Sequence, residues 1–326
     1  MNIVFASEGL GSVTPRAVWA LGTFDGVHRG HVALLRAAQR QAREKGLPAG
    51  AFTFDVNPIE VLAPQRRPLY LVSLQRKLEL FEEAGVDQVV VRRFEPEFAA
   101  CSPQEFARAV LAEQLGAEHV VVGYDYTFGR MGQGTPVLLV QLGVELGFGV
   151  TVVPQVKVDG VPVSSTAIRE AVALGDVERA ARMLGRPHAV DGVVEHGRGV
   201  GAGMGIPTAN LRTAKGIALP ARGVYACVVR TQDGAHWPAV CNIGTRPTFS
   251  DEARGVRVEA HLVGASGDFH NQRMTVQFVQ RLRPEMVFSD RAELVAQIRA
   301  DIVRAVELVG SDACGAGLQL QGRMLE

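Results

Sequence analysis

The sequence predicts two domains of different class: an α/β domain with a mostly parallel sheet, then a small all-β barrel with a terminal helix. The first reason is length, because 326 residues exceed the roughly 100–200 residues of a usual compact domain. The second is that strand-like and helix-like segments alternate in the first half, as in βαβ units. The third is that short β-rich runs, with hardly a helix between them, follow Pro187, which favours a barrel. We therefore expect domains at residues 1–186 and 187–310.

Five apolar runs in the first half are predicted strands. They are Ala17–Leu21, Ala49–Phe54, Val86–Arg92, His119–Gly123 and Val150–Val153. Helices are expected over His31–Lys45 and Ser73–Ala84, each followed by a glycine that ends it. Another helix begins with a capping box at Ser102–Glu105 and runs to Leu115.

The second half contains five predicted strands and one long helix. The strands are Ala189–Glu195, Gly223–Arg230, Trp237–Ile243, Val256–Leu262 and Arg273–Gln280. Polar and apolar residues alternate along Val256–Leu262, which is the period of a half-buried strand. The helix begins beside Asp290, which with Glu293 resembles a capping pair, and its apolar stripe reaches Val309. Residues 311–326 have no clear pattern and are expected to form a loose tail.

The composition excludes several classes of protein. Lys and Arg number 34, as do Asp and Glu, so the basic excess of a nucleic-acid-binding protein is absent and no nucleic acid is expected as a partner. Cys101, Cys227, Cys241 and Cys314 are widely spaced, which favours a reducing cytoplasm over a disulfide framework or a zinc site. No apolar run is long enough to span a membrane, and Met1–Pro15 lacks the pattern of a signal peptide.

A glycine- and histidine-rich segment joins the first predicted strand to the first helix, where ligands bind in open α/β sheets. Gly22, Gly26 and Gly30 allow a ligand to approach the backbone, and a helix N-terminus offers free N–H groups to a phosphate. His28 and His31 are three residues apart, so both rings can face a departing pyrophosphate and stabilise its charge. The alternative is a glycine-rich turn with two surface histidines.

A second anion site is expected where Ser164, Ser165 and Thr166 open a helix. Hydroxyl groups at a helix N-terminus are ordinary caps, and that alternative stays open. Arg169, one turn into this helix, adds a cation that could reach a triphosphate.

A third candidate segment follows the strand that ends at Gly123. Asp125 could contact a ribose hydroxyl, while Phe128 and the flanking Tyr124 and Tyr126 could stack on a planar ring. The alternative is an aromatic loop that simply packs against the domain.

The fourth candidate lies in the predicted barrel. Four glycines stand close together, Gly201 and Gly205 among them, and could fold over phosphates; the alternative is a flexible surface loop. Thr208 and Asn210 supply oxygen atoms suited to Mg²⁺. Glu259 is the only carboxylate of its strand and could act as the general base of a phosphoryl transfer, or be a solvated side chain on an open sheet face.

These motifs, in this order, resemble those of bacterial bifunctional riboflavin kinase/FAD synthetases. The matching segments of the first half are Thr23–His31, Gly123–Gly129, Ser164–Arg169 and Leu184–Pro187. Those of the second half are Gly205–Asn210, Gly223–Tyr225, Asn242–Gly244, Pro247–Phe249 and Val258–Glu259. Several motifs in order are far more specific than any one of them.

For residues 1–186, the resemblance implies a Rossmann-like nucleotidyltransferase domain that adenylates FMN to FAD. The residues that would hold ATP or flavin there are Gly22, Phe24, Asp25, Gly26, His28, Gly30, His31, Asp125, Ser164, Ser165, Thr166 and Arg169. Of these, His28, His31 and Arg169 would act on the phosphates during the reaction.

For residues 187–310, the resemblance implies a six-stranded barrel that phosphorylates the ribityl 5′-hydroxyl of riboflavin. Gly201, Gly205, Thr208 and Asn210 would place ATP, with Thr208 and Asn210 as Mg²⁺ ligands and Glu259 as the base. The implied cofactor of both domains is Mg²⁺, and the implied partners are ATP, riboflavin and FMN.

The second half departs more from the family pattern than the first. Ala202 stands where an arginine is usual, and Ile206 replaces a phenylalanine. In the first half, Val56-Asn57-Pro58 stands where Pro-His-Pro is frequent. Two alternatives therefore accompany the two-step enzyme: an FMN adenylyltransferase with a weak or degenerate kinase domain, and a flavin-binding regulator without turnover. A regulator has no need of the histidine pair or Arg169, which argues against that alternative.

Overall fold

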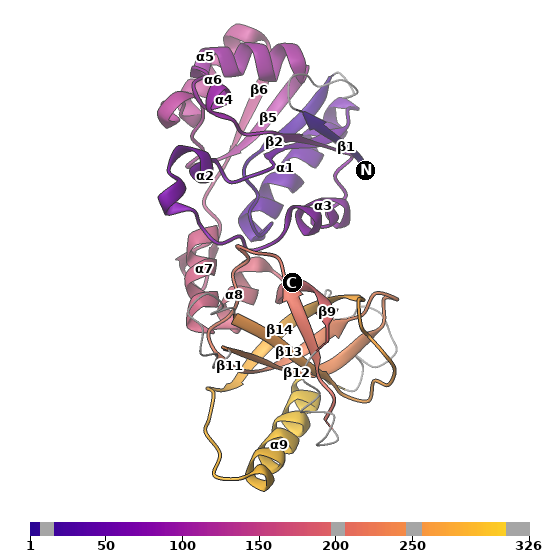
Figure 1. Cartoon of the computed structure of the whole chain (residues 1–326). Coiled ribbons are helices and arrows are strands. Elements are labelled where there is room, and N and C mark those ends of the chain that lie inside the picture. Colours follow the sequence, from indigo (N-terminus) through magenta and orange to yellow (C-terminus); the bar gives the residue numbers. More distant parts are fainter. Residues whose placement is uncertain (7–15, 197–205, 246–255, 311–326) are drawn as a thin grey trace. The chain divides into compact units, whose positions relative to one another are not determined.

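The computed structural model describes residues 1–6, 16–196, 206–245 and 256–310 (Figure 1). Contacts divide the chain into two compact units. The first unit comprises Met1–Leu69 and Leu74–Ser164, and the second comprises Tyr70–Ser73 and Ser165–Glu326. The first contains a parallel sheet with helices and the second an antiparallel barrel, so the predicted fold classes are confirmed.

The sheet of the first unit has six parallel strands in the order β1-β4-β3-β2-β5-β6. They are β1 (Asn2–Ala6), β2 (Ala17–Leu21), β3 (Ala49–Phe54), β4 (Gln88–Arg92), β5 (Ala117–Gly123) and β6 (Gly149–Val153). All five predicted strands are present, and the edge strand β1 was missed. The order reverses at β2, because the chain adds β3 and β4 on one side of it and β5 and β6 on the other.

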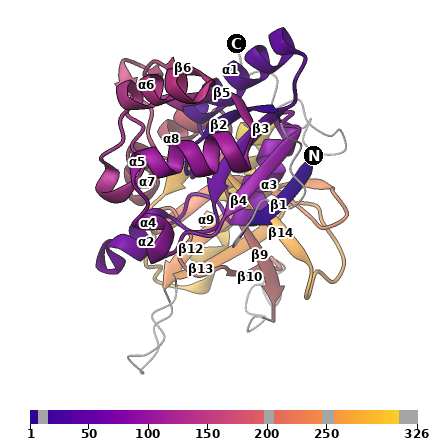
Figure 2. The same cartoon turned by 90° about the horizontal axis from the view of Figure 1, so that it is seen from above.

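Helices cover both faces of this sheet (Figures 1 and 2). The helices are α1 (Arg29–Lys45), α3 (Leu74–Glu83), α5 (Pro103–Glu105), its continuation η2 (Phe106–Gln114) and α6 (Pro136–Leu146). Shorter elements are α2 (Pro58–Leu62), η1 (Pro64–Arg66), α4 (Pro96–Ala99), η3 (Arg130–Gly132), β7 (Lys157–Val158) and β8 (Val161–Pro162). Helix α1 packs against β2, β3 and β5, while Trp19 and Leu21 of β2 lie in a core cluster with residues of η2 and α6.

Two helices of the first unit differ from what the sequence predicts. The capping box at Ser102–Glu105 forms as predicted, but the helix after it is wound as a π-helix over Phe106–Gln114. Helix α6 was missed, although Thr135 caps it and Pro136 stands at its first position. Its exposed face carries Val137, Val140 and Val144, so no polar face marked the helical period.

In the second unit, two helices precede six strands that close into an antiparallel barrel, and a last helix follows. The elements are α7 (Ser165–Leu174), α8 (Val177–Leu184), β9 (His188–Glu195), β10 (Ala209–Thr213), β11 (Gly223–Arg230), β12 (His236–Thr245), β13 (Val256–Leu262), β14 (Arg273–Arg283) and α9 (Arg291–Val309). The barrel order is β10-β13-β12-β11-β14-β9, closed by pairing of β9 with β10. Asp290 caps α9 by accepting a hydrogen bond from the Glu293 amide, as predicted, whereas α8 and the short β10 were missed.

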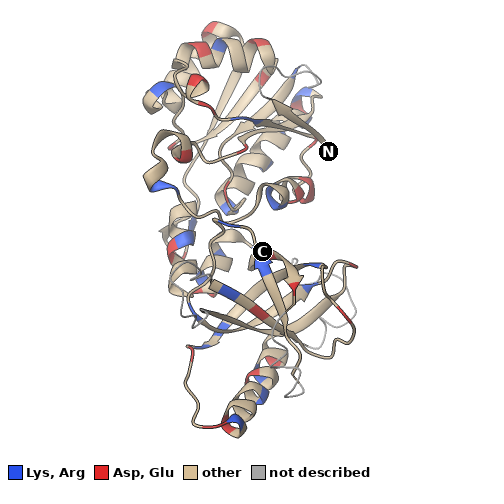
Figure 3. Cartoon of the chain, in the orientation of Figure 1, with Lys and Arg blue, Asp and Glu red and all other residues tan. Residues whose placement is uncertain are grey.

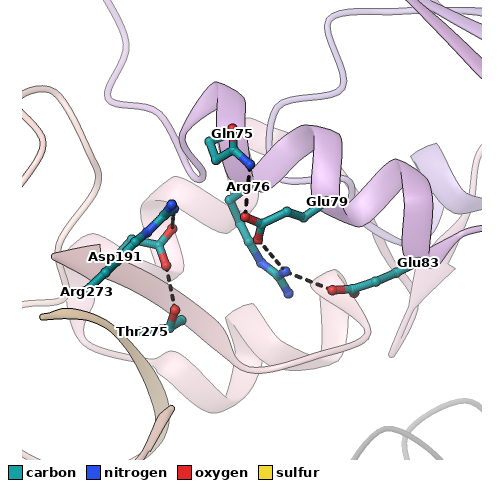
Figure 4. Close-up of polar contacts among 7 residues, drawn as sticks. All are labelled: Gln75, Arg76, Glu79, Glu83, Asp191, Arg273 and Thr275. Carbon is teal, nitrogen blue, oxygen red and sulfur yellow. Dashed lines mark hydrogen bonds and ion pairs between the residues drawn. The ribbon is translucent and has the colours of Figure 1, made fainter. Parts of the chain in front are cut away.

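The barrel has an apolar interior and a polar outer face. On β13, Val258, Ala260 and Leu262 are buried, whereas Arg257 and Glu259 remain partly exposed, which confirms the predicted alternation. Positive and negative side chains are interspersed over the described elements (Figure 3). Where β9 pairs with β14, Asp191 accepts a 2.7 Å hydrogen bond from the Thr275 hydroxyl (Figure 4). Within the described residues, no helix is long and apolar enough to cross a membrane.

Candidate active sites

The first candidate site lies at the carboxyl ends of β2 and β5, two neighbouring strands of the first sheet. The two strands are hydrogen-bonded neighbours, and the strand order reverses between them. Open α/β sheets bind ligands in the crevice formed at such a point. The loop after β2 carries the glycine–histidine motif, and the loop after β5 carries Asp125. The fold therefore brings two of the predicted motifs to the same end of two neighbouring strands.

The loop after β2 has an unusual backbone. Phe24, Gly26 and Val27 have positive φ values of 52°, 84° and 40°. For a β-branched valine this is a strained conformation. Phe24 and Val27 are buried, with 0% and 2% of their surface exposed, so packing against the core holds the loop in this shape.

His28 and His31 form a stacked pair where this loop enters α1. Their ring centroids are 3.5 Å apart and their planes differ by 12°. His28 is the N-cap of α1, and its Nδ1 accepts a hydrogen bond of 3.2 Å from the His31 amide. Because Nδ1 accepts, the proton of the neutral ring is on Nε2. The Nε2–H group of His28 is therefore a hydrogen-bond donor, the kind of group that binds phosphate oxygens.

Neighbouring residues fix the position of the two rings. The Phe24 ring lies 5.1 Å from the His31 ring and 5.1 Å from Phe81. A Cβ atom at Gly30 would come within 3.1 Å of His28 Cε1, which explains why the motif has glycine there. A Cβ atom at Gly22 would come within 3.2 Å of the Phe24 ring. Asp25, which is only 5% exposed, brings a buried carboxylate into the same loop.

The loop after β5 divides between a packing part and an exposed part. Phe128 is 6% exposed and belongs to the core, where its ring lies 5.5 Å from Phe106 and 5.8 Å from Tyr126. Burial raises the pKa of Tyr126. The Phe128 ring therefore packs in the core, with Tyr126 stacked on it, and is too buried to offer a face to a ligand. Asp125 is exposed and stays a candidate.

The third motif begins α7, in the second unit. This helix starts at Ser165, as predicted, and its buried face is formed by Ile168, Ala171 and Val172. Arg169 is half-buried, and its Nη2 lies 3.3 Å from the Thr166 hydroxyl. The hydroxyl and the guanidinium group thus stand together at the helix start.

The barrel aligns three polar side chains across neighbouring strands. Glu259 of β13 is directly opposite Asn210 of β10 on one side and Asn242 of β12 on the other. Directly opposite residues in antiparallel strands project from the same face. All three are partly exposed, in contrast to the buried residues that alternate with them. The predicted pair of Asn210 and Glu259 is therefore brought together, and Asn242, which was not predicted, joins them.

Two contacts hold this row in place. Arg257 Nη1 lies 2.8 Å from Glu259 Oε1, so the carboxylate is oriented by a cation on its own strand. His261 Nδ1 lies 2.7 Å from the Pro207 carbonyl oxygen, which ties the segment before Thr208 to β13.

A pocket of about 320 Å³ adjoins this row and is lined by Thr208 and Asn210, among others. Its wall also contains His196 and His270, whose rings are stacked with centroids 3.5 Å apart. Because these two histidines are far apart in the sequence, the sequence alone does not predict that they pair. Gly201 and Gly205, predicted to fold over phosphates, lie outside the described residues.

The side chains of the barrel row, together with the neighbouring Thr208, suit a hard divalent cation such as Mg²⁺. A threonine hydroxyl, an asparagine carbonyl and a carboxylate are all oxygen ligands. Among the described residues, no group of three or more His, Cys, Asp and Glu side chains is placed to hold a metal.

Comparison with known proteins identifies the same two units. The family model for FAD synthetase matches residues 11–167, and that for riboflavin kinase matches residues 184–309. The chain is 38% identical over 295 residues to the bifunctional riboflavin kinase/FMN adenylyltransferase of Escherichia coli strain K12, covering 90% of this chain and 93% of the relative. Its identity to the protein of the same name from Pseudomonas fluorescens is 37% over 309 residues, covering 94% and 98%.

A solved structure described as a macrolide-efflux protein from Streptococcus pneumoniae has a similar fold throughout. It superposes with a TM-score of 0.84 at 30% identity, covering 92% of this chain and 97% of that one. The efflux description is that protein's own. The two family models match the present sequence directly and agree with the curated relatives.

Proposed function

This chain belongs to the family of bifunctional riboflavin kinase/FMN adenylyltransferases, and from this premise we propose how its residues divide the work. The protein is a transferase that phosphorylates riboflavin to FMN and adenylates FMN to FAD, with ATP as the donor in both reactions. We assign adenylylation to residues 1–186 and phosphorylation to residues 187–310. We further propose that the enzyme works in the cytoplasm, where free thiols persist.

In adenylylation, a phosphate oxygen of FMN attacks the α-phosphorus of ATP, and the bond to the bridging oxygen of the departing pyrophosphate breaks. The negative charge that develops on pyrophosphate needs donors already in place. His28 supplies its Nε2–H group, and His31 lies stacked beside it at the start of α1. Gly22, Gly26 and Gly30 let the phosphates approach the backbone and the free amides of the helix.

Other residues bind the substrates of this step. We propose that Phe24 and Asp25 shape the nucleotide site from within the loop, and that the exposed Asp125 contacts the nucleotide. Ser164, Ser165, Thr166 and Arg169 bind phosphate oxygens through hydroxyl and guanidinium groups.

In phosphorylation, Glu259 accepts the proton of the ribityl 5′-hydroxyl as that oxygen attacks the γ-phosphorus of ATP, and ADP leaves. Arg257 keeps the Glu259 carboxylate in place through their 2.8 Å ion pair. Thr208 and Asn210, in the adjoining pocket, would hold Mg²⁺ with ATP, and Gly201 and Gly205 would contact the phosphates. The ion, when bound, neutralises triphosphate charge.

One observation carries the assignment of adenylylation: the capped histidine pair stands at the point where the strand order reverses. The test is to incubate the protein with riboflavin, ATP and Mg²⁺ and to separate the products by chromatography. We expect FMN and then FAD. FAD from supplied FMN but no product from riboflavin would reduce the chain to an adenylyltransferase, and bound flavin without turnover would refute both assignments.

A further inference from the structure

A buried lysine lies directly behind the adenylylation loop. Lys77 is only 8% exposed and stands on the buried face of α3, beside Leu78 and one turn before Phe81. Lysine is almost never fully buried unless its charge is compensated. The neighbouring Arg76, by contrast, forms ion pairs with two carboxylates of its own helix, those of Glu79 and Glu83 (Figure 4).

The ammonium group of Lys77 binds the end of β3 and the loop that follows β2, the strand that carries the histidine motif. Its Nζ donates to the Thr23 carbonyl at 3.2 Å, to the Thr53 hydroxyl at 3.2 Å and to the Phe54 carbonyl at 3.0 Å. The Thr53 hydroxyl donates in turn to the Thr23 carbonyl at 3.1 Å. All three ammonium hydrogens are thus used, and they join α3 to the ends of β2 and β3.

The first of these acceptors begins the strained part of the loop. In the four residues that follow Thr23, the backbone has positive φ at Phe24, Gly26 and Val27. A strained segment persists only where its surroundings hold it. The Lys77 ammonium group holds the carbonyl of Thr23, the residue at which this segment begins, five positions before His28.

The charge of Lys77 is maintained by two carboxylates. Asp25 of the loop and Asp55, just after β3, both favour the protonated amine. Burial acts in the opposite sense and is the larger effect, so it lowers the pKa of Lys77 to about 8. The amine therefore begins to lose its proton in mildly alkaline solution, where an exposed lysine stays charged.

We propose that Lys77 is a positioning residue for adenylylation, whose ammonium group holds the Thr23–Val27 loop in the conformation that presents the two histidines to ATP. This rests on the adenylylation assigned above. Lys77 does not touch the reacting atoms. It acts through the Thr23 carbonyl and through the carboxylate of Asp25.

The first test compares Lys77→Met, which removes the charge, with Lys77→Arg, which keeps it, and with Lys45→Met as the matched change of an exposed lysine. FAD formation from FMN is measured against pH, and riboflavin phosphorylation in the same samples reports the other unit. Because a small displacement of a catalytic group can cost about 100-fold, we expect a loss of that order in Lys77→Met, and none in Lys45→Met.

The pH profile separates positioning from a general loss of structure. In the unaltered enzyme, FAD formation should fall as the pH rises through about 8, and this alkaline decrease should be absent in both Lys77 variants. The proposal is overturned if Lys77→Met keeps normal activity, or if it keeps the same alkaline decrease. An unaltered enzyme that makes no FAD at all would instead refute the proposed function.

A second variant covers the case in which Lys77→Met does not fold. Thr53→Val keeps the shape of the side chain and removes only the hydroxyl between Lys77 and Thr23. We expect a loss of about tenfold in FAD formation. In a double-mutant cycle with Lys77→Arg, the loss of activity in the double variant should differ from the product of the two single losses, because the two residues are coupled. A Thr53→Val enzyme with normal activity would show that these contacts do not position the loop.

Discussion

The two candidate sites are built in different ways. In the first unit, the histidine pair and its glycines belong to one continuous segment between β2 and α1. In the barrel, Asn210, Asn242 and Glu259 come from three strands and meet only through the pairing register. A continuous motif has its geometry fixed by local backbone conformation, whereas a row across strands depends on the whole barrel.

The two sites also differ in burial. Phe24, Asp25 and His28 are at most 6% exposed, whereas Asn210 and Glu259 are partly exposed on the outer face of the barrel. The first site is thus held by its core, and the second by surface contacts such as the Arg257–Glu259 pair. The predictions below test this separation, since each change should affect one site and leave the other intact.

The largest effect is expected from replacing both His28 and His31 by alanine. Removal of a single preorganised donor costs about 10²–10³ in rate, so the double change should lower FAD formation from FMN by at least about 10³. Riboflavin phosphorylation should be unchanged when both products are quantified by chromatography. An equal loss of both activities would mean that the sites are not separate.

The next effect is expected from Glu259→Gln, which keeps the size of the side chain and removes the base. A positioned general base contributes about 10²–10⁴, and we expect a loss of about 10²–10³ in riboflavin phosphorylation, with adenylylation of supplied FMN intact. Glu195 is the matched control, because it lies opposite Asn210 on β9 and pairs with Arg212. If Glu195→Gln lowered riboflavin phosphorylation more than Glu259→Gln does, Glu195 and not Glu259 would be the base.

Acid should weaken the barrel through His188. This residue is 1% exposed, its Nε2 lies 2.9 Å from the Ala218 carbonyl oxygen, and burial lowers its pKa to about 4. Between its ordinary pKa of 6.5 and this value, the unfolded chain takes up a proton that the folded barrel does not. The free energy of unfolding therefore decreases by about 3 kcal/mol as the pH falls from 6.5 toward 4.

Tryptophan fluorescence can follow this effect in the barrel alone. Trp19 lies in the first unit and Trp237 in β12 of the barrel, so a Trp19→Phe background reports only the barrel. His188→Gln in that background should flatten the dependence of the melting temperature on pH. A variant that melts with the same acid sensitivity would exclude His188 as its cause.

The smallest effect is expected from Gly30→Ala. The new Cβ would lie 3.1 Å from the His28 ring, so the ring must shift by a few tenths of an ångström. We expect FAD formation to fall about tenfold with phosphorylation unaffected. A Gly30→Ala enzyme with unchanged adenylylation kinetics would show that the ring position is less critical than its stacking suggests.

The difference between the sites also explains how much the sequence could predict. The histidine pair, its glycines and the start of α7 were found because the residues are adjacent in the sequence. Asn242 belongs to one of the matched motifs, but the sequence assigns it no role, because a single sequence does not show the register that places it beside Glu259.

The fold shows the same limits. Five of the six parallel strands were predicted from their apolar runs, but β10 was missed because only Ala209 and Leu211 are apolar and buried along its five residues. Lys77 had a weak signal as a charged residue within the apolar stripe of α3. Its meaning depends on contacts with β2 and β3, which no helical pattern contains.

The most direct test of the account is a crystal structure of the enzyme with a non-hydrolysable ATP analogue and Mg²⁺. The account predicts a triphosphate at the start of α1, with His28 Nε2 and His31 within hydrogen-bond distance of its oxygens. A nucleotide bound in the first unit with its phosphates away from both histidines would contradict it.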